Sequence, residues 1–134
     1  MKPLVVFACV HNAGRSQMAA AFFNSLADTA RVSATSAGTE PGAGVHPEVV
    51  AAMRELGFDL TPAKPQLLTP DLGARAAILV TMGCGEACPY VPGVVRLDWP
   101  LEDPKGKPIE TVRSIRDDIR ARVAAFVSEN GWER

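Results

Sequence analysis

The chain has 134 residues, of which 47% are hydrophobic and 22% charged, and its formal net charge is −1 at pH 7. This length is typical of one hydrophobic core, so we expect a single domain over residues 1–134. The near-zero charge argues against nucleic acid or an anionic membrane as the main partner, and no apolar run is long enough for a membrane span or a secretory leader, so we expect a cytoplasmic protein.

The first predicted strand, Leu4–Ala8, leads directly into the sequence Cys9-Val10-His11-Asn12-Ala13-Gly14-Arg15-Ser16. A helix is predicted over Ser16–Ala27, so this loop connects a strand to a helix N-terminus. Backbone N–H groups at a helix start have no intrahelical partner, and several that point at one centre bind an anion. Arg15 adds a planar guanidinium that can hold two oxygens of the same anion. We therefore predict that Val10–Arg15 form a tetrahedral-oxyanion site, with the sulfur of Cys9 as a nucleophile.

Other residues of this loop suit the same purpose. The positive field of the loop would stabilise a negatively charged sulfur on Cys9, and Ser16 can donate a further hydrogen bond to it. Gly14 permits backbone conformations that are closed to other residues. Asn12 tolerates a left-handed turn and can brace the loop through its amide. The alternative is purely structural, a buried cysteine at a strand end beside a helix-start arginine.

The rest of the chain continues to alternate between strands and helices. In order, we predict a strand over Arg31–Ser36, a loop over Thr39–Gly44, a helix over Pro47–Leu56, an ordered surface loop over Thr61–Asp71, strands over Ala76–Thr81 and Val94–Asp98, and a helix over Ser114–Glu129. In this last helix Ser114 is the expected N-cap, and one face carries Ile115, Ile119, Val123 and Phe126. The pattern predicts an α/β fold with a four-stranded parallel sheet flanked by helices.

This topology would bring distant residues to one site. In open parallel sheets, ligands bind beyond the carboxyl ends of the strands. Cys9 follows the first predicted strand, Cys84 the third and Asp103 the fourth. We therefore expect all three side chains at the same edge of the sheet.

A second pair of cysteines, Cys84 and Cys88, is separated by three residues and accompanied by Gly83, Gly85 and Pro89. A helix would orient the two sulfurs poorly for a disulfide, whereas a flexible loop, which the glycines and the proline favour, lets them bridge. An odd total of three cysteines argues against a static disulfide framework. Two alternatives stay open: the cysteines are incidental, or they bind zinc with Cys9 or His11 as a further ligand. We expect no bound metal.

The loop resembles that of the low-molecular-weight tyrosine phosphatases and of the arsenate reductases built on the same fold. Further segments are similar to the reductase branch: Arg15-Ser16-Gln17-Met18-Ala19, Ser36-Ala37-Gly38-Thr39 with Val45-His46-Pro47, the cysteine segment Thr81–Pro89, and Trp99-Pro100-Leu101-Glu102-Asp103-Pro104. The resemblance extends from about residue 4 to about residue 127.

The resemblance implies reduction of arsenate to arsenite, in arsenic detoxification, by three cysteines. Cys9 would attack arsenic while Asp103, as general acid, helps water to leave. Cys84 would then attack the sulfur of Cys9 and release arsenite, and Cys88 would resolve the Cys9–Cys84 disulfide. Thioredoxin would reduce the resulting Cys84–Cys88 disulfide. No bound cofactor is implied, and phosphate or sulfate would compete for the oxyanion site. Mycothiol with mycoredoxin is an alternative reductant.

Two other functions remain open at this stage. A low-molecular-weight tyrosine phosphatase would need only Cys9 among the cysteines. It would also benefit from aromatic side chains around the site to hold a phosphotyrosine ring, and only 6% of the residues in this chain are aromatic. Weak phosphatase activity is compatible with a reductase. A non-catalytic oxyanion or redox sensor would also use a reactive cysteine with a disulfide partner.

Some polar and aromatic residues near these motifs have competing interpretations. Asp98 and Glu102 compete with Asp103 for the role of acid. We interpret His11 as adjacent to the substrate and His46 as a helix-start residue, neither of them a catalytic base. Tyr90 and Trp99 either border the pocket or simply pack.

Overall fold

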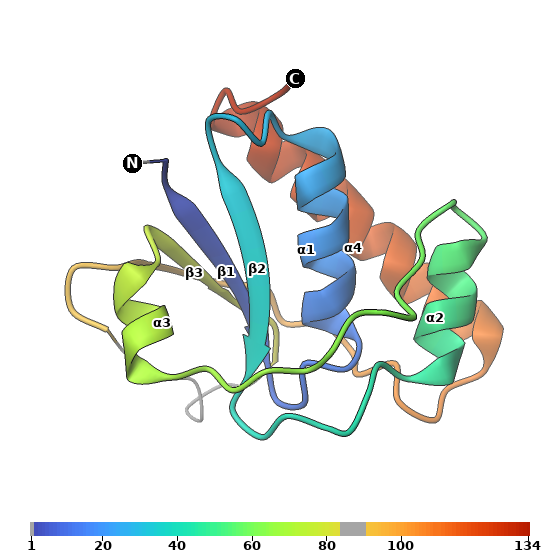
Figure 1. The fold of residues 1–134 in the computed structure, drawn as a ribbon. Coiled ribbons are helices and arrows are strands. Elements are labelled where there is room, and N and C mark those ends of the chain that lie inside the picture. The colour runs from blue at the N-terminus through green and yellow to red at the C-terminus, as the bar shows by residue number, and fades with distance from the viewer. Residues whose placement is uncertain (1, 84–90) are drawn as a thin grey trace.

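The fold is a parallel sheet flanked by helices, seen in a computed structural model that describes residues 2–83 and 91–134 (Figure 1). Its elements are β1 (Leu4–Cys9), α1 (Arg15–Leu26), β2 (Ser33–Gly38), α2 (Pro47–Arg54), α3 (Pro70–Arg75), β3 (Ile78–Thr81), β4 (Val95–Asp98) and α4 (Ile109–Glu129). The strand order is β2-β1-β3-β4, and each neighbouring pair is parallel. The predicted α/β class with four parallel strands is confirmed.

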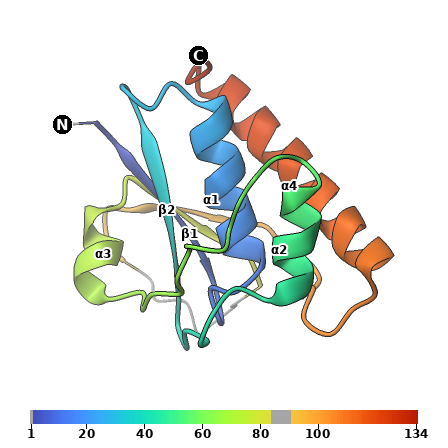
Figure 2. The ribbon, with the colours of Figure 1, turned by 45° about the vertical axis from the view of Figure 1, so that its right-hand side comes forward.

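Strand β1 lies inside the sheet and is covered on both faces. Val5 and Phe7 belong to the larger cluster, which α1, α2 and α4 complete, whereas Val6 and Ala8 belong to a smaller cluster with α3. Figures 1 and 2 show α3 alone on its side of the sheet and the other three helices opposite. Because alternate side chains of a strand point to opposite faces, a strand buried on both faces must be apolar throughout, as the sequence indicated.

An aromatic cluster fixes α1 and α4 against β1. The ring of Phe23 in α1 lies 6.0 Å from Phe7, 6.0 Å from Phe126 and 5.8 Å from Trp132, measured between ring centroids. Trp99 completes the cluster at 5.9 Å from Phe7 and 5.7 Å from Phe126. Such tilted and edge-to-face pairs stabilise packing beyond the area that they bury. Trp99, which follows β4, is partly buried, packs against the core and orients the segment that leads to Asp103.

Helix α4 begins five residues earlier than predicted. It starts at Ile109, and the carbonyl of Pro108 accepts hydrogen bonds from the backbone N–H groups of Thr111 and Val112. The fixed φ of proline suits a helix start, and this signal outweighed the serine that we expected to cap the helix. Ser114 is an exposed residue inside α4, so its prediction as N-cap was wrong. The predicted apolar face is confirmed, with its four members buried: Ile115, Ile119, Val123 and Phe126.

Helix α3 was not predicted. Residues 61–71 were expected to form a surface loop, but a helix begins at Pro70. The side chain of Thr69 accepts a hydrogen bond from the N–H of Leu72 at 3.1 Å, which caps the helix. Threonine followed by proline is a local start signal. With six residues, this helix is too short to show a helical periodicity of apolar residues in the sequence. It is stabilised by the burial of Leu72 against the sheet.

An ionic cluster joins α2 to α4. Glu55, at the end of α2, accepts hydrogen bonds from Arg113 at 2.6 Å and from Arg116 at 2.8 Å. Arg116 is buried and also donates to the carbonyl of Ala52 at 2.9 Å. Hydrogen bonds from Arg113, and then from Arg116, lower the pKa of Glu55 from its ordinary 4.5 to about 2. This cluster fixes the position of α2, whose first residues lie at the carboxyl edge of the sheet.

The low pKa of Glu55 predicts a pH-dependent contribution to stability. A carboxylate whose pKa is lower in the folded state stabilises the protein above its unfolded-state pKa, and this contribution is lost as the pH falls. Glu55→Gln should therefore lower the free energy of unfolding at pH 7, and its difference from the parent should shrink as the pH falls from 4.5 towards 2. Urea unfolding at several pH values measures this difference. Glu129→Gln, at an exposed glutamate of α4, is the control. A Glu55→Gln effect independent of pH would contradict the assignment.

Candidate active site

The loop over residues 10–14 connects the end of β1 to the start of α1. Cys9 is the last residue of β1 and is 2% exposed. Gly14 is the N-cap of α1 and supplies no side-chain cap to the first turn. Because the N–H groups of a first helical turn point away from the helix, this turn can donate to an anion placed beside Cys9.

The sulfur of Cys9 is held by a buried hydrogen-bond chain. Sγ of Cys9 lies 2.9 Å from Oγ of Ser16, and Nδ2 of Asn12 donates to the same Oγ at 2.8 Å. Since the serine oxygen accepts from Asn12, its own hydrogen is available for the sulfur. Thiolate is the nucleophilic form of cysteine, and a hydrogen bond donated to sulfur favours it.

Asn12 braces the loop, as the sequence predicted. Its φ is 51°, the only positive value among the described non-glycine residues, and its side chain is fully buried. Oδ1 of Asn12 accepts from the backbone N–H of Gln66 at 3.0 Å and from Nε2 of Gln17 at 3.2 Å. The two contacts fix which end of the amide faces Ser16. Sequence reasoning did not identify Gln17 or Gln66 as supports, although Gln17 lies in the quoted helix-start motif.

Arg15 reaches across the site to the segment that follows β4. Its Nη1 donates to the carbonyl of Leu101 at 3.1 Å, and its Nη2 lies 3.8 Å from Oδ2 of Asp103. Gly83, with φ +95°, approaches the guanidinium so closely that a Cβ at this position would overlap Nη1. Arg15 is therefore contacted by two segments that are far from it in the sequence, one at Gly83 and one at residues 101–103.

One narrow cleft collects most of the predicted site residues. It is lined by Cys9, His11, Ala13, Gly14, Arg15, His46 and Asp103. The structure thus places the predicted nucleophile, arginine and acid together, while Cys84, Cys88 and Tyr90 lie outside the described residues. The other acid candidates lie elsewhere: Asp98 accepts a hydrogen bond from Thr81 at 2.7 Å, and Glu102 lines a separate hollow beside α4. His46 was expected only to start α2, and it also lines the cleft.

Within the described residues, no three histidine, cysteine or acidic side chains are grouped so that they could hold a metal ion. No helix in the described part of the chain is long and apolar enough to cross a membrane.

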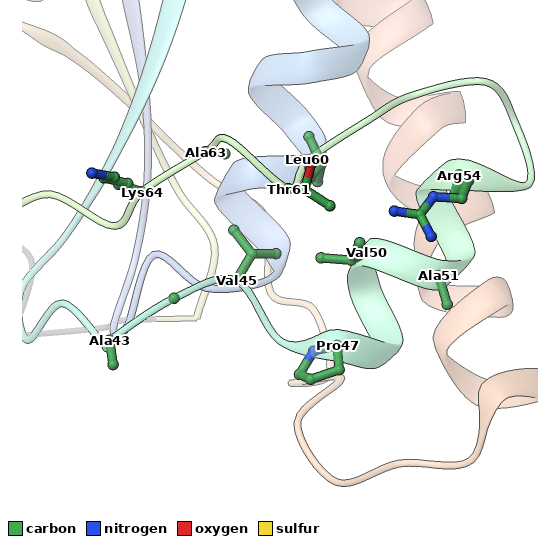
Figure 3. Close-up of a pocket in the computed structure, with 11 residues that line it drawn as sticks. Ala43, Val45, Pro47, Val50, Ala51, Arg54, Leu60, Thr61, Ala63 and Lys64 are labelled. Carbon is green, nitrogen blue, oxygen red and sulfur yellow. The ribbon is translucent and has the colours of Figure 1, made fainter.

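A wider groove of about 490 Å³ lies between α2 and residues 60–64 (Figure 3). Val45, Val50 and Leu60 form its apolar walls, with Arg54 and Lys64 as its charged members. No cysteine, histidine or carboxylate lines this groove, so it lacks a nucleophile and an acid. The narrower cleft at Cys9 is therefore the candidate active site.

The sequence and the fold are similar to those of known proteins. The sequence profile described as low molecular weight phosphotyrosine protein phosphatase matches residues 4–89. A Halobacterium salinarum protein, provisionally named as an arsenate reductase, is 41% identical over 129 residues, covering 92% of this chain and 89% of its own. The arsenate reductase of Brevibacillus brevis is 36% identical, covering 93% and 94%. The structure of a thioredoxin-dependent arsenate reductase of Corynebacterium glutamicum is similar with a TM-score of 0.81 and 37% identity, over 96% of this chain and 61% of that longer one.

The hydrogen-bond chain predicts that Asn12→Gly weakens the nucleophile without preventing the turn. Glycine adopts φ near 51° freely, so the loop backbone can keep its path while the amide contacts to Ser16, Gln17 and Gln66 are lost. We expect Cys9 to react with iodoacetamide about tenfold more slowly at pH 7, since a buried hydrogen bond is worth about 1–3 kcal/mol when its partner is left unsatisfied. Mass spectrometry of the Cys9 peptide gives the rate. A rate equal to that of the parent in a folded variant would disprove the role of Asn12.

Proposed function

Because the chain belongs to the low molecular weight phosphotyrosine protein phosphatase family, we propose that it uses the oxyanion site of that family to reduce arsenate to arsenite. The relatives named as arsenate reductases align with more than nine-tenths of this chain. The observation that carries the proposal is the arrangement of Cys9, Arg15 and Asp103 around one cleft. Phosphate and sulfate, being tetrahedral oxyanions, would compete for the same site.

The first step proposed is attack by the thiolate of Cys9 on arsenic. A sulfur–arsenic bond forms, and an arsenic–oxygen bond breaks as the departing oxygen takes a proton from Asp103 and leaves as water. The N–H groups of residues 10–15 and the guanidinium of Arg15 would hold the remaining oxygens. The contact between Ser16 and Sγ of Cys9 supports this assignment, because a serine hydroxyl at 2.9 Å can donate a hydrogen bond to the attacking sulfur.

The second step proposed uses the cysteines of residues 84–88. The sulfur of Cys84 attacks the sulfur of Cys9, the sulfur–arsenic bond breaks, and the electron pair stays on arsenic, which leaves as arsenite. Cys88 then attacks Cys84, freeing Cys9 and leaving a Cys84–Cys88 disulfide. An external dithiol reduces that disulfide. The similar reductase of Corynebacterium glutamicum is thioredoxin-dependent, so thioredoxin is the reductant that we infer, with mycothiol and mycoredoxin as the alternative.

The competing activity is phosphate ester hydrolysis, for which the family is named. A phosphatase would form a phosphocysteine at Cys9 and release it with water. An aryl phosphate would need apolar walls for its ring, and within the described part of the chain no phenylalanine, tyrosine or tryptophan lines the cleft. This observation favours a free inorganic anion as the main substrate, with weak phosphatase activity as a side reaction.

We also infer that residues 1–134 act as one arsenate reductase domain in the cytoplasm. The relay begins from three free thiols, and a reducing compartment keeps thiols in that form. No bound cofactor is proposed, because the electrons come from the cysteines.

The relay predicts thioredoxin-coupled turnover that depends on Cys84. Arsenate-dependent oxidation of NADPH, with thioredoxin and thioredoxin reductase present, should be continuous for the parent. This oxidation should vanish for Cys84→Ser, since a serine cannot form the disulfide with Cys9 that releases arsenite. Hydrolysis of aryl phosphate without arsenate-dependent turnover would identify a phosphatase instead. Anion binding or oxidation without any turnover, also after addition of mycothiol and mycoredoxin, would identify a sensor.

The acid assignment predicts a difference between two neighbouring carboxylates. Asp103→Asn should slow formation of the arsenylated Cys9 by about 100-fold or more, since general acid catalysis typically contributes 10²–10⁴-fold. Glu102→Gln removes an equal charge next to it but outside the cleft, and should change the rate little. Single-turnover kinetics with excess enzyme measures both. Equal effects of the two substitutions would exclude Asp103 as the acid.

A further inference from the structure

We propose that His46 is a further substrate-contacting residue, whose imidazole donates a hydrogen bond to the anion oxygen that points away from the oxyanion loop. The inference rests on the proposed function for arsenate as the substrate. The contact itself would apply to any tetrahedral oxyanion in the cleft. It extends the site from β1, α1 and the segment after β4 to the start of α2.

The position of His46 relative to the loop is fixed by backbone contacts. Its N–H donates to the carbonyl of Ala13 at 2.9 Å, which ties the residue to the oxyanion loop itself. The ring carbon Cδ2 lies 3.6 Å from where a Cβ on Gly14 would stand. The ring therefore lies against the last residue before α1, and His46 shares the cleft with Cys9 and Asp103.

The imidazole of His46 takes no part in capping the helix that it precedes. Helix α2 receives no side-chain cap from His46, because its first turn bonds to the backbone carbonyl of this residue. Neither ring nitrogen has a hydrogen-bond partner among the described residues. His11, the other histidine of the cleft, differs in this respect, since its Nδ1 lies 3.0 Å from the carbonyl oxygen of Glu40.

The chemistry of the cleft leaves one side of the anion for this ring. In the proposed function the loop N–H groups and Arg15 hold the anion from the side of α1, and Asp103 is assigned to the departing oxygen. A tetrahedral anion presents a further oxygen to the opening of the cleft, where water would otherwise solvate it. A neutral imidazole carries one N–H donor, so His46 can bind that oxygen whatever the central atom is.

The test measures phosphate binding directly, so it does not depend on reductase turnover. Phosphate should protect Cys9 from iodoacetamide, and the concentration dependence of protection, followed by mass spectrometry of the Cys9 peptide, gives the dissociation constant. Three variants are compared with the parent: His46→Asn, His46→Gln and Arg54→Gln. Asparagine is a favourable residue before a helix, so His46→Asn should fold. Arg54→Gln removes a full charge from the same helix but outside the cleft.

We expect His46→Asn to weaken phosphate binding about tenfold, since a hydrogen bond to a charged group is worth about 1.5 kcal/mol or more. His46→Gln keeps an N–H donor of similar reach and should recover part of the loss, and Arg54→Gln should bind as the parent does. The KM for arsenate should rise with the phosphate dissociation constant, with a smaller change in kcat.

Unchanged phosphate binding in folded His46→Asn would overturn the proposal, as would an equal loss in Arg54→Gln, which would indicate a general charge effect. These outcomes do not depend on whether the protein reduces arsenate. Weaker phosphate binding in His46→Asn, combined with a parent that does not reduce arsenate, would support the contact and reject the reductase. Arsenate reduction by the parent, with phosphate binding and KM unchanged in His46→Asn, would support the reductase and reject the contact.

Discussion

Asn12 carries the constraint on which the rest of the site depends. A buried asparagine at a φ of 51° turns the loop back over the end of β1, and its amide links the backbone near residue 66 to Ser16 and, through Ser16, to the sulfur of Cys9. Every polar atom of this amide faces a partner, so its orientation is determined, and with it the direction in which the serine hydroxyl points. A buried polar network of this kind specifies one arrangement because any other leaves a group unpaired. Cys9, the proposed nucleophile, is thus oriented by side chains that do not line the cleft.

The same cleft depends on contacts made far from it. The aromatic cluster around Phe23 sets α1 against the sheet and holds Trp99, from which the chain runs to Asp103. The ionic cluster of Glu55 holds α2, and Glu48 of α2 accepts a hydrogen bond from the backbone of Gly106 at 3.2 Å. Through these contacts the start of α2 and the acid segment are brought to the loop after β1. Because packed helices transmit small displacements, the distance between Arg15 and Asp103 is set by the core as well as by the site.

The oxyanion loop by itself does not choose between reduction and phosphate transfer. In the proposed function it would present N–H groups, a guanidinium and a sulfur to any tetrahedral anion, and both chemistries would begin with attack by that sulfur. The choice depends on what surrounds the loop. The described walls of the cleft include Asp103 and His46 but no phenylalanine, tyrosine or tryptophan, and the proposal of a small free anion as substrate rests on this lining. Further thiols within reach would turn the first covalent intermediate into a reduced product. The function therefore depends on the surroundings of the nucleophile more than on its own motif.

The sequence by itself determined the local features of this protein. The apolar run before Cys9, the loop that ends at Arg15, and the alternation of strands and helices each depend on residues close together in the chain, and the parallel fold follows from them. The sequence could not show that α4 starts at Ile109 or that a short helix begins at Pro70, because helices of marginal length are stabilised by what they pack against. The family resemblance selected Asp103 among three neighbouring carboxylates, and the tertiary structure shows that its carboxylate lies 3.8 Å from Arg15. Only the tertiary structure brought His46 into the cleft and set Gln17 and Gln66 as supports of Asn12. These are contacts between segments that are distant in the chain. Their geometry is fixed by packing, and a sequence motif does not give the distance between two such segments.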